Sequence, residues 1–306
     1  MSRVPFYTVD VFTEQRFSGA QIAVFTDAES LDDDTRQKIA AEMNLSDTVF
    51  LEPEQDGYRI ANYNAFEQTG FGSHTTVAAA CALADAGKLK RTADHVPLNF
   101  YYKHGVYSAN IGFTPKLFVQ MTICTAPIVD NYVPSNSELA AILSLEEKDL
   151  SSKKFTPKLV SNEGLFLIVP VNSLEAVRKA RFSHERWQSS TAPSTLAQQI
   201  LLISESTEEP SADFHLRLMG AQISEKEDPP VGSSIPAFAA FLCAHQHLAK
   251  GTYCYTVERG LSNLRQSLLH VEMDHKGRDT LAVRIGGNGI IMSKGEMFTS
   301  HLKAVN

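Results

Sequence analysis

The stretch TTVAAACALADA, residues 75–86, places small and apolar side chains on nearly every side of a helix. A helix without a polar face has no side to present to water, so it must be surrounded by protein. The second half of the chain contains a similar stretch, IPAFAAFLCAHQHL, at residues 235–248. We therefore expect two central helices, each buried inside its own unit.

Both stretches open in the same way, which indicates an internal duplication. Gly72-Ser73-His74 precedes the first and Gly232-Ser233-Ser234 precedes the second, 160 positions later in a chain of 306 residues. Apolar, β-branched runs typical of strands lie before and after each helix. The sequence predicts an α+β fold with strands at residues 6–12, 21–25, 48–51, 58–63, 98–102, 106–111 and 116–123, and again at 213–220, 253–258, 268–273 and 281–285.

The boundary between the two units is expected in the proline-containing segment 125–135. We assign residues 1–126 to the first unit and 127–289 to the second, and leave open that residues 290–306 return to the first. An amphipathic helix is expected after a cap at Ser30 or Asp32. The polar segment 184–195 is expected to form a loop or short helix, and the clustered glycines 286–289 a tight turn between two late strands.

Composition excludes several classes of protein. The chain has 28 basic and 35 acidic residues, a formal charge of −7, so it lacks the basic surface that binds nucleic acid. The amino-terminal residues lack the apolar core of a signal peptide, and no apolar stretch is long enough to span a bilayer. The four cysteines are too few for a disulfide framework, and they lie too far apart for paired metal ligands. We expect a cytoplasmic protein with reduced thiols and no membrane partner.

The two helix starts are the first candidates for a binding site. Backbone N–H groups in the first turn of a helix lack partners, and the helix dipole makes that end partly positive. Glycine lets a ligand approach the backbone closely, so such a start suits a carboxylate or a developing enolate. The alternative is that glycine and serine only cap the helices. The substrate-binding candidates are Gly72, Ser73, Gly232 and Ser234.

Two titratable side chains near these starts, His74 and Asp228, are also candidates, each with a structural alternative, whereas nothing in the neighbourhood of Asp47 indicates catalysis. His74 lies in the first turn of the first helix, where a neutral imidazole can exchange protons, although a buried structural histidine is equally common. Asp228 stands before the second helix start, in a segment that prolines stiffen. This position suits a carboxylate that binds an amine or transfers a proton; the alternative is that Asp228 only contributes surface charge. Asp47, read from its neighbours alone, is a turn residue.

Four segments, in order along the chain, resemble the PhzF-like family of phenazine-biosynthesis isomerases, which share the diaminopimelate epimerase fold. They are VDVFTEQRFSGAQIAVFTDAESL (9–31), IAAEMNLSDTVFL (39–51), FGSHTT (71–76), and DFHLRLMG (213–220) with EDPPVGSSIPAF (227–238). The resemblance implies two pseudo-symmetric domains, each a β-barrel or roll around a central helix. It also implies an active site in the cleft between them, no cofactor, and a homodimer.

By position, the resemblance makes Asp47, His74, Asp228 and Ser233 the catalytic residues. Asp47 replaces the glutamate of the family, which shortens the carboxylate by one methylene group. Related epimerases use two cysteines at the helix starts; this chain has Ser73 and Ser233 there. The sequence therefore disfavours a two-thiol mechanism.

Three functional hypotheses follow. The first is a cofactor-independent isomerase or epimerase that moves a proton between carbons of a small, carboxylate-bearing substrate. The second is a catalytically weak relative that keeps the site as a small-molecule binding module, motivated by the shorter Asp47 and the altered helix starts. A structural scaffold that uses the repeat for dimerisation ranks third. Neither a metal nor a nucleotide is expected, because no metal-ligand or phosphate-binding motif is present.

Overall fold

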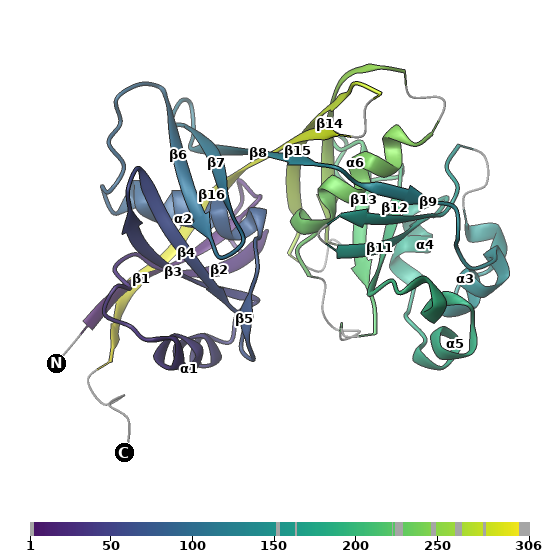
Figure 1. Ribbon diagram of the computed structural model, residues 1–306, viewed down its shortest axis with the longest axis horizontal. Coiled ribbons are helices and arrows are strands. Elements are labelled where there is room, and N and C mark those ends of the chain that lie inside the picture. Colours follow the sequence, from purple (N-terminus) through teal and green to yellow (C-terminus); the bar gives the residue numbers. More distant parts are fainter. Residues whose placement is uncertain are drawn as a thin grey trace. The chain divides into compact units, whose positions relative to one another are not determined.

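The computed structural model describes residues 3–150, 154–162, 164–221, 223, 229–245, 249–260, 265–277 and 280–299. The chain divides into two compact units (Figure 1). Unit 1 comprises Met1–Thr122 and Gly286–Asn306, and unit 2 comprises Ile123–Ile285. The division thus falls after residue 122, where the sequence placed it after 126, and the chain from Gly286 onward belongs to unit 1.

Unit 1 is a closed barrel of eight strands with one helix inside it. Strand β16 (Leu281–Phe298) pairs with β1 (Arg3–Val11) and is also a neighbour of β8 (Phe118–Thr125), which closes the ring. The other barrel strands are β2 (Ala20–Phe25), β3 (Asp47–Glu54), β4 (Gly57–Tyr63), β6 (His95–Tyr102) and β7 (Gly105–Gly112). A two-residue strand, β5 (Gln68–Thr69), pairs with the end of β4.

The central helix of unit 1 is α2 (Ser73–Asp85), which lies within the ring of strands (Figure 1). Every residue from Ser73 to Leu83 is buried, as the all-round apolar pattern predicts. A second helix, α1 (Asp33–Met43), packs against β3 and β4. Its cap is Asp32, whose Oδ1 accepts a hydrogen bond of 2.8 Å from the Thr35 N–H.

The prediction of a tight turn at residues 286–289 is wrong, because this segment lies inside the continuous strand β16. The glycines serve close packing instead. A Cβ on Gly287 would lie 2.4 Å from Cδ1 of Phe12, and one on Gly289 would lie 2.6 Å from Sγ of Cys81. Both distances are too short for a side chain, so β16 can pass this close to Phe12 and Cys81 only with glycine at these positions.

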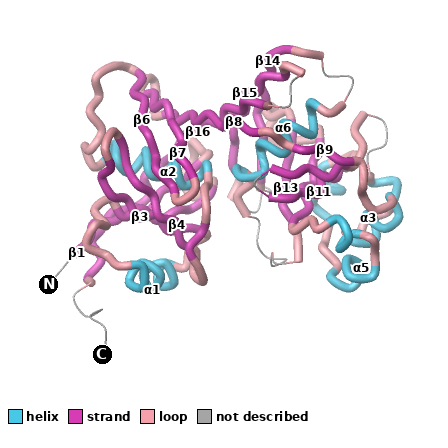
Figure 2. Tube along the Cα trace, in the orientation of Figure 1, coloured by secondary structure: helices cyan, strands magenta, loops and turns pink. Residues whose placement is uncertain are grey.

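Unit 2 wraps its strands around α6 (Ile235–Cys243), a helix in which every residue from Ile235 to Leu242 is buried. Two helices, α3 (Asn136–Ile142) and α5 (His184–Ser189), pack together at its periphery (Figure 2). The remaining elements are β9 (Ile128–Asp130), β10 (Lys158–Asn162), β11 (Gly164–Pro170), α4 (Leu174–Lys179), β12 (Gln199–Ser204), β13 (Phe214–Met219), β14 (Gly251–Arg259), β15 (Ser267–His275) and three 3₁₀ turns (Glu147–Asp149, Ala192–Thr195, Gly232–Ser234).

Strand pairing repeats in the two units and confirms the duplication. From β1 to β7 successive pairs are antiparallel, parallel, antiparallel, parallel and antiparallel. From β10 to β15 the pairs follow the same order. In each unit the second parallel pair is joined by a crossover that contains the central helix, because parallel neighbours need a long connection. The fold is α+β, with a barrel or roll of strands around one helix in each unit.

Candidate active site

Asp47 is the first residue of β3, and its side chain lies on the inner face of the unit 1 barrel. Side chains alternate along a strand, so Asp47 shares a face with Val49, which is fully buried. Val49 is opposite Asn62 of β4, and Asn62 is in turn opposite Thr69 of β5. The strand register therefore gathers Asp47, Asn62 and Thr69 at one end of the barrel.

His74, the second residue of α2, meets Asp47 at this end. Its Nε2 lies 3.0 Å from Oδ2 of Asp47, and only 11% and 14% of the two side chains are exposed. When Asp47 is ionised, its oxygen can only accept, so Nε2 carries the proton and donates it. The helix start and the strand start, 27 positions apart in sequence, thus bring an imidazole and a carboxylate into contact.

Gly72 makes room for this pair. It is the N-cap of α2, with φ −144°, an extended conformation that any residue can adopt. A Cβ at this position would lie 2.8 Å from Cε1 of His74 and 3.2 Å from both ring nitrogens. Position 72 therefore requires glycine because the imidazole ring packs against it. The backbone conformation there does not require glycine.

The second carboxylate oxygen of Asp47 is held by Thr69, a residue that sequence reasoning missed. Thr69 Oγ1 donates a hydrogen bond of 3.2 Å to Oδ1 of Asp47. Asn62 fixes the surrounding segment, because its Nδ2 donates to the Gly70 carbonyl at 2.8 Å and to Thr75 Oγ1 at 3.0 Å. A two-residue strand carries too little periodicity to be recognised from sequence, so Thr69 had no visible signal.

Three buried polar atoms at the start of α2 have no hydrogen-bond partner within the described residues: Ser73 Oγ, His74 Nδ1 and Asn62 Oδ1. Ser73 itself is completely buried. Buried polar groups are normally paired, because an unpaired one costs about 1–3 kcal/mol. They lie beside a helix start, where the first N–H groups have no partner within the helix, so this end of the barrel has capacity for further polar contacts.

In unit 2 the second helix start differs from the first. Gly232–Ser234 forms a 3₁₀ turn ahead of α6, and the Ser234 hydroxyl donates a hydrogen bond of 2.7 Å to the Val231 carbonyl. Gly232 and Ser234 are buried, whereas Ser233 is exposed. Asp228, the remaining predicted catalytic residue, lies outside the described residues. The structure thus brings together Asp47, His74, Gly72 and Ser73, all in unit 1.

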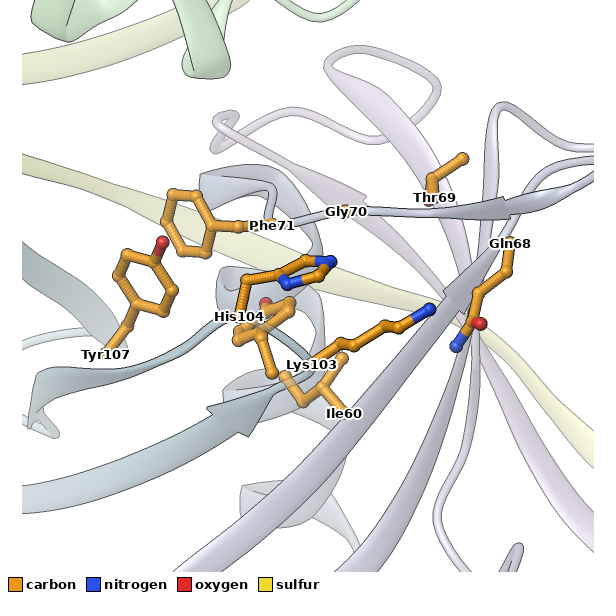
Figure 3. A pocket seen from close by; sticks show the side chains of 9 residues that line it. Ile60, Gln68, Thr69, Gly70, Phe71, Lys103, His104 and Tyr107 are labelled. Carbon is orange, nitrogen blue, oxygen red and sulfur yellow. The ribbon is translucent and has the colours of Figure 1, made fainter. Parts of the chain in front are cut away.

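A pocket of about 130 Å³ lies in unit 1 at the seam between β4 and β6 (Figure 3). Strands β4 and β6 pair only from Gly57 to Arg59, and β4 then pairs with β5 instead. The pocket occupies this seam and is lined by Ile60, Gln68, Thr69, Gly70, Phe71, Tyr102, Lys103, His104 and Tyr107.

Among the described residues, no three histidine, cysteine, aspartate or glutamate side chains are grouped as metal ligands. No helix in that part of the chain has the length and apolar character needed to cross a bilayer.

Known proteins resemble this chain over nearly its whole length. The family described as "Phenazine biosynthesis-like protein" matches residues 9–295. An uncharacterized isomerase of Mesorhizobium japonicum is 28% identical over 94% of this chain and 97% of its own. The trans-2,3-dihydro-3-hydroxyanthranilate isomerase of Pseudomonas aeruginosa is 23% identical over 96% of this chain and 99% of its own.

A solved structure gives the same fold. The phenazine biosynthesis protein of the PhzF family from Bacillus anthracis superposes with a TM-score of 0.86, at 22% identity, over 98% of this chain and all of its own. The family match and the named isomerases agree with the resemblance seen in the four sequence segments. The chain belongs to the phenazine biosynthesis-like (PhzF) family and is an isomerase.

Proposed function

We propose that this isomerase moves a proton between carbon atoms of a small, carboxylate-bearing substrate, without a cofactor, and that Asp47 is its general acid and base. The single observation that carries the proposal is the placement of Asp47. Both of its oxygens are held, by His74 and by Thr69, while 14% of its side chain stays exposed. A proton-transfer group needs this combination of a fixed orientation and an accessible face.

His74 is the second proton-transfer group in this proposal. Its contact of 3.0 Å with Asp47 lets one proton move between imidazole and carboxylate without rearrangement of either chain segment. The start of α2, with its partly positive end and the unpaired Ser73 hydroxyl, supplies donors for a substrate carboxylate or an enolate oxygen.

Solvent exchange at carbon tests the proposal. The protein is incubated in D2O with a panel of amino acids and cyclic hydroxy acids, including trans-2,3-dihydro-3-hydroxyanthranilate, the substrate named for the Pseudomonas relative. Deuterium incorporation is followed by NMR and mass spectrometry. An enzyme of this class exchanges a carbon-bound proton, whereas a binding module only shifts its own resonances.

Asp47→Asn identifies the acid/base residue on any substrate found. The amide keeps the shape of the side chain but cannot take up a proton, so exchange should fall by about 10²- to 10⁴-fold while binding changes little. Asp94→Asn, which changes an exposed carboxylate that pairs with Arg91, is the matched control. Exchange at the wild-type rate in Asp47→Asn would refute the assignment.

The family resemblance adds Asp228 and Ser233 to the proposed site. We expect Ser233→Ala to raise KM more than it lowers kcat, because a hydroxyl that binds the substrate acts in the ground state and the transition state alike. Asp228→Asn should lower kcat if this carboxylate takes part in proton transfer. Wild-type kinetics in both variants would limit the catalytic set to unit 1.

A further inference from the structure

The pocket at the barrel seam of unit 1 has a preformed apolar wall. Phe71 and Tyr107 stack with ring centroids 3.8 Å apart, and Tyr102 meets both rings edge-on at 5.2 and 5.5 Å. The Tyr102 hydroxyl is fixed to the central helix by hydrogen bonds of 3.2 Å to Thr75 and 2.5 Å to Thr76. The wall therefore exists without a ligand and needs little reorganisation to bind one.

The polar side of the pocket consists only of groups that can donate. Lys103 extends toward the Gln68 amide from the turn between β6 and β7, which also carries His104 (Figure 3). Within the described part of the chain Lys103 forms no ion pair. The lining contains no aspartate or glutamate, although acidic residues outnumber basic ones in the sequence by 35 to 28. This local excess of donors favours an anion.

We propose that this pocket binds a small organic anion: a carboxylate carried on a body of about one six-membered ring. The size follows from the volume of about 130 Å³, since an apolar cavity of about 150 Å³ accommodates benzene. The ring body packs against Ile60 and the aromatic wall, and the carboxylate accepts from Lys103, with Gln68 and His104 as further donors. Two classes of contact thus converge on one ligand, as is typical of small-molecule sites.

The pocket adjoins the segment that contains β5, and Asp47 is not among the residues that line it. Figure 3 shows the side chains of Gln68 and Thr69 pointing in opposite directions from this strand. Gln68 faces Lys103, whereas Thr69 Oγ1 reaches Asp47. A ligand in the pocket therefore rests against the segment that orients the catalytic carboxylate, without contacting that carboxylate. This placement predicts an effector that changes turnover and does not compete with the substrate, a prediction that rests on the proposed function.

Direct binding measurements test the site itself. Benzoate, with benzyl alcohol as its uncharged analogue, is titrated by calorimetry and NMR into the full-length protein. We expect benzoate to bind the wild type and Asp47→Asn alike, and benzyl alcohol to bind more weakly. Lys103→Gln should weaken benzoate binding about tenfold, because it removes the charge-assisted hydrogen bond. Lys90→Gln, which removes a lysine outside this pocket, should leave binding unchanged.

The same probe tests the effector role once a substrate is known. Benzoate should alter the exchange rate at saturating substrate, and Lys103→Gln should remove that effect. Equal binding of benzoate to Lys103→Gln and the wild type, or equal affinity for benzyl alcohol, would overturn the anion site. Loss of binding in Asp47→Asn, or purely competitive inhibition, would place the probe in the catalytic site instead. Because benzoate binding is measured directly, the result of that titration stays valid even if no isomerase activity is found.

Discussion

The imidazole of His74 packs so closely on Gly72 that any side chain at position 72 would collide with it. A Cβ there would lie 2.8 Å from Cε1 of His74. The ring in turn holds Asp47 through a contact of 3.0 Å, so the space left by one glycine determines the geometry of the proposed proton-transfer pair.

Gly72→Ala should therefore act on catalysis more than on folding. Its backbone conformation suits alanine, but the added methyl group displaces the His74 ring, and a shift of about 1 Å at a catalytic group can lower turnover about 100-fold. Gly251→Ala in unit 2 is the matched control, because a Cβ there would meet Tyr253 at 3.7 Å, an ordinary contact. Both variants are compared by exchange kinetics and thermal unfolding. An equal loss of activity in both would contradict the steric explanation.

Thr69 should prove to be a positioning residue for Asp47. Thr69→Val keeps the shape but removes the hydroxyl that donates to Oδ1, so kcat should fall about tenfold with little change in KM. Thr69→Ser should restore kcat, because serine keeps the hydroxyl. A Thr69→Ser variant as slow as Thr69→Val would contradict the positioning role.

A buried pair in unit 2 should make stability depend on pH. Glu258 is fully buried, and its burial raises the carboxyl pKa, but hydrogen bonds from His215 and from the N–H groups of Glu209 and Glu208 outweigh that effect and lower the pKa below 4.5. A lowered pKa stabilises the folded state above about pH 4.5, and this contribution disappears as the pH falls through the folded-state value.

Glu258→Gln should thus reduce the free energy of unfolding by about 3 kcal/mol at pH 7, because it leaves the buried His215 without its ionised partner. The difference from the wild type should shrink as the pH is lowered toward 3. Urea unfolding across this range measures it, with Glu185→Gln as a control at an exposed position on α5. A difference that does not vary with pH would contradict the linkage.

The glycines of β16 should be intolerant of side chains. Gly287→Ala places a methyl group 2.4 Å from the Phe12 ring, and overpacking of this kind costs about 1–3 kcal/mol. Gly251→Ala in β14 is the control, since its nearest neighbour would be Tyr253 at 3.7 Å, an ordinary contact. Thermal unfolding distinguishes the two variants, because Gly287→Ala should unfold at a lower temperature than Gly251→Ala.

Thiol reactivity should follow burial. Burial raises the pKa of Cys81 to about 12, whereas Cys254 is exposed. Because the thiolate is the reactive form, Cys254 should react with a disulfide reagent in the native protein and Cys81 only after unfolding. Labelling followed by peptide mass spectrometry reads both sites, and rapid native labelling of Cys81 would show that the barrel opens.

Much of the fold was readable from local sequence patterns. An apolar helix needs surrounding protein, and a repeated Gly-Ser start with strands around it indicates a duplicated unit, so the central helices α2 and α6 followed from residues 75–86 and 235–248. Those patterns are local, because buried side chains recur along the sequence with the period of the helix or strand that carries them. Glycines 286–289 escaped the same reasoning, since their conformation depends on Phe12 and Cys81, which are remote in sequence.

The sequence by itself determined the elements, the duplication and, through the family resemblance, the identity of Asp47 and His74 as candidates. Only the tertiary structure decided what holds them. The register of β3, β4 and β5 brings Thr69 to Asp47, and the packing of the His74 ring on Gly72 orients that ring. Hydrogen bonds act over about 3 Å, while the residues they join here are 22 and 27 positions apart, so strand pairing rather than local sequence places them.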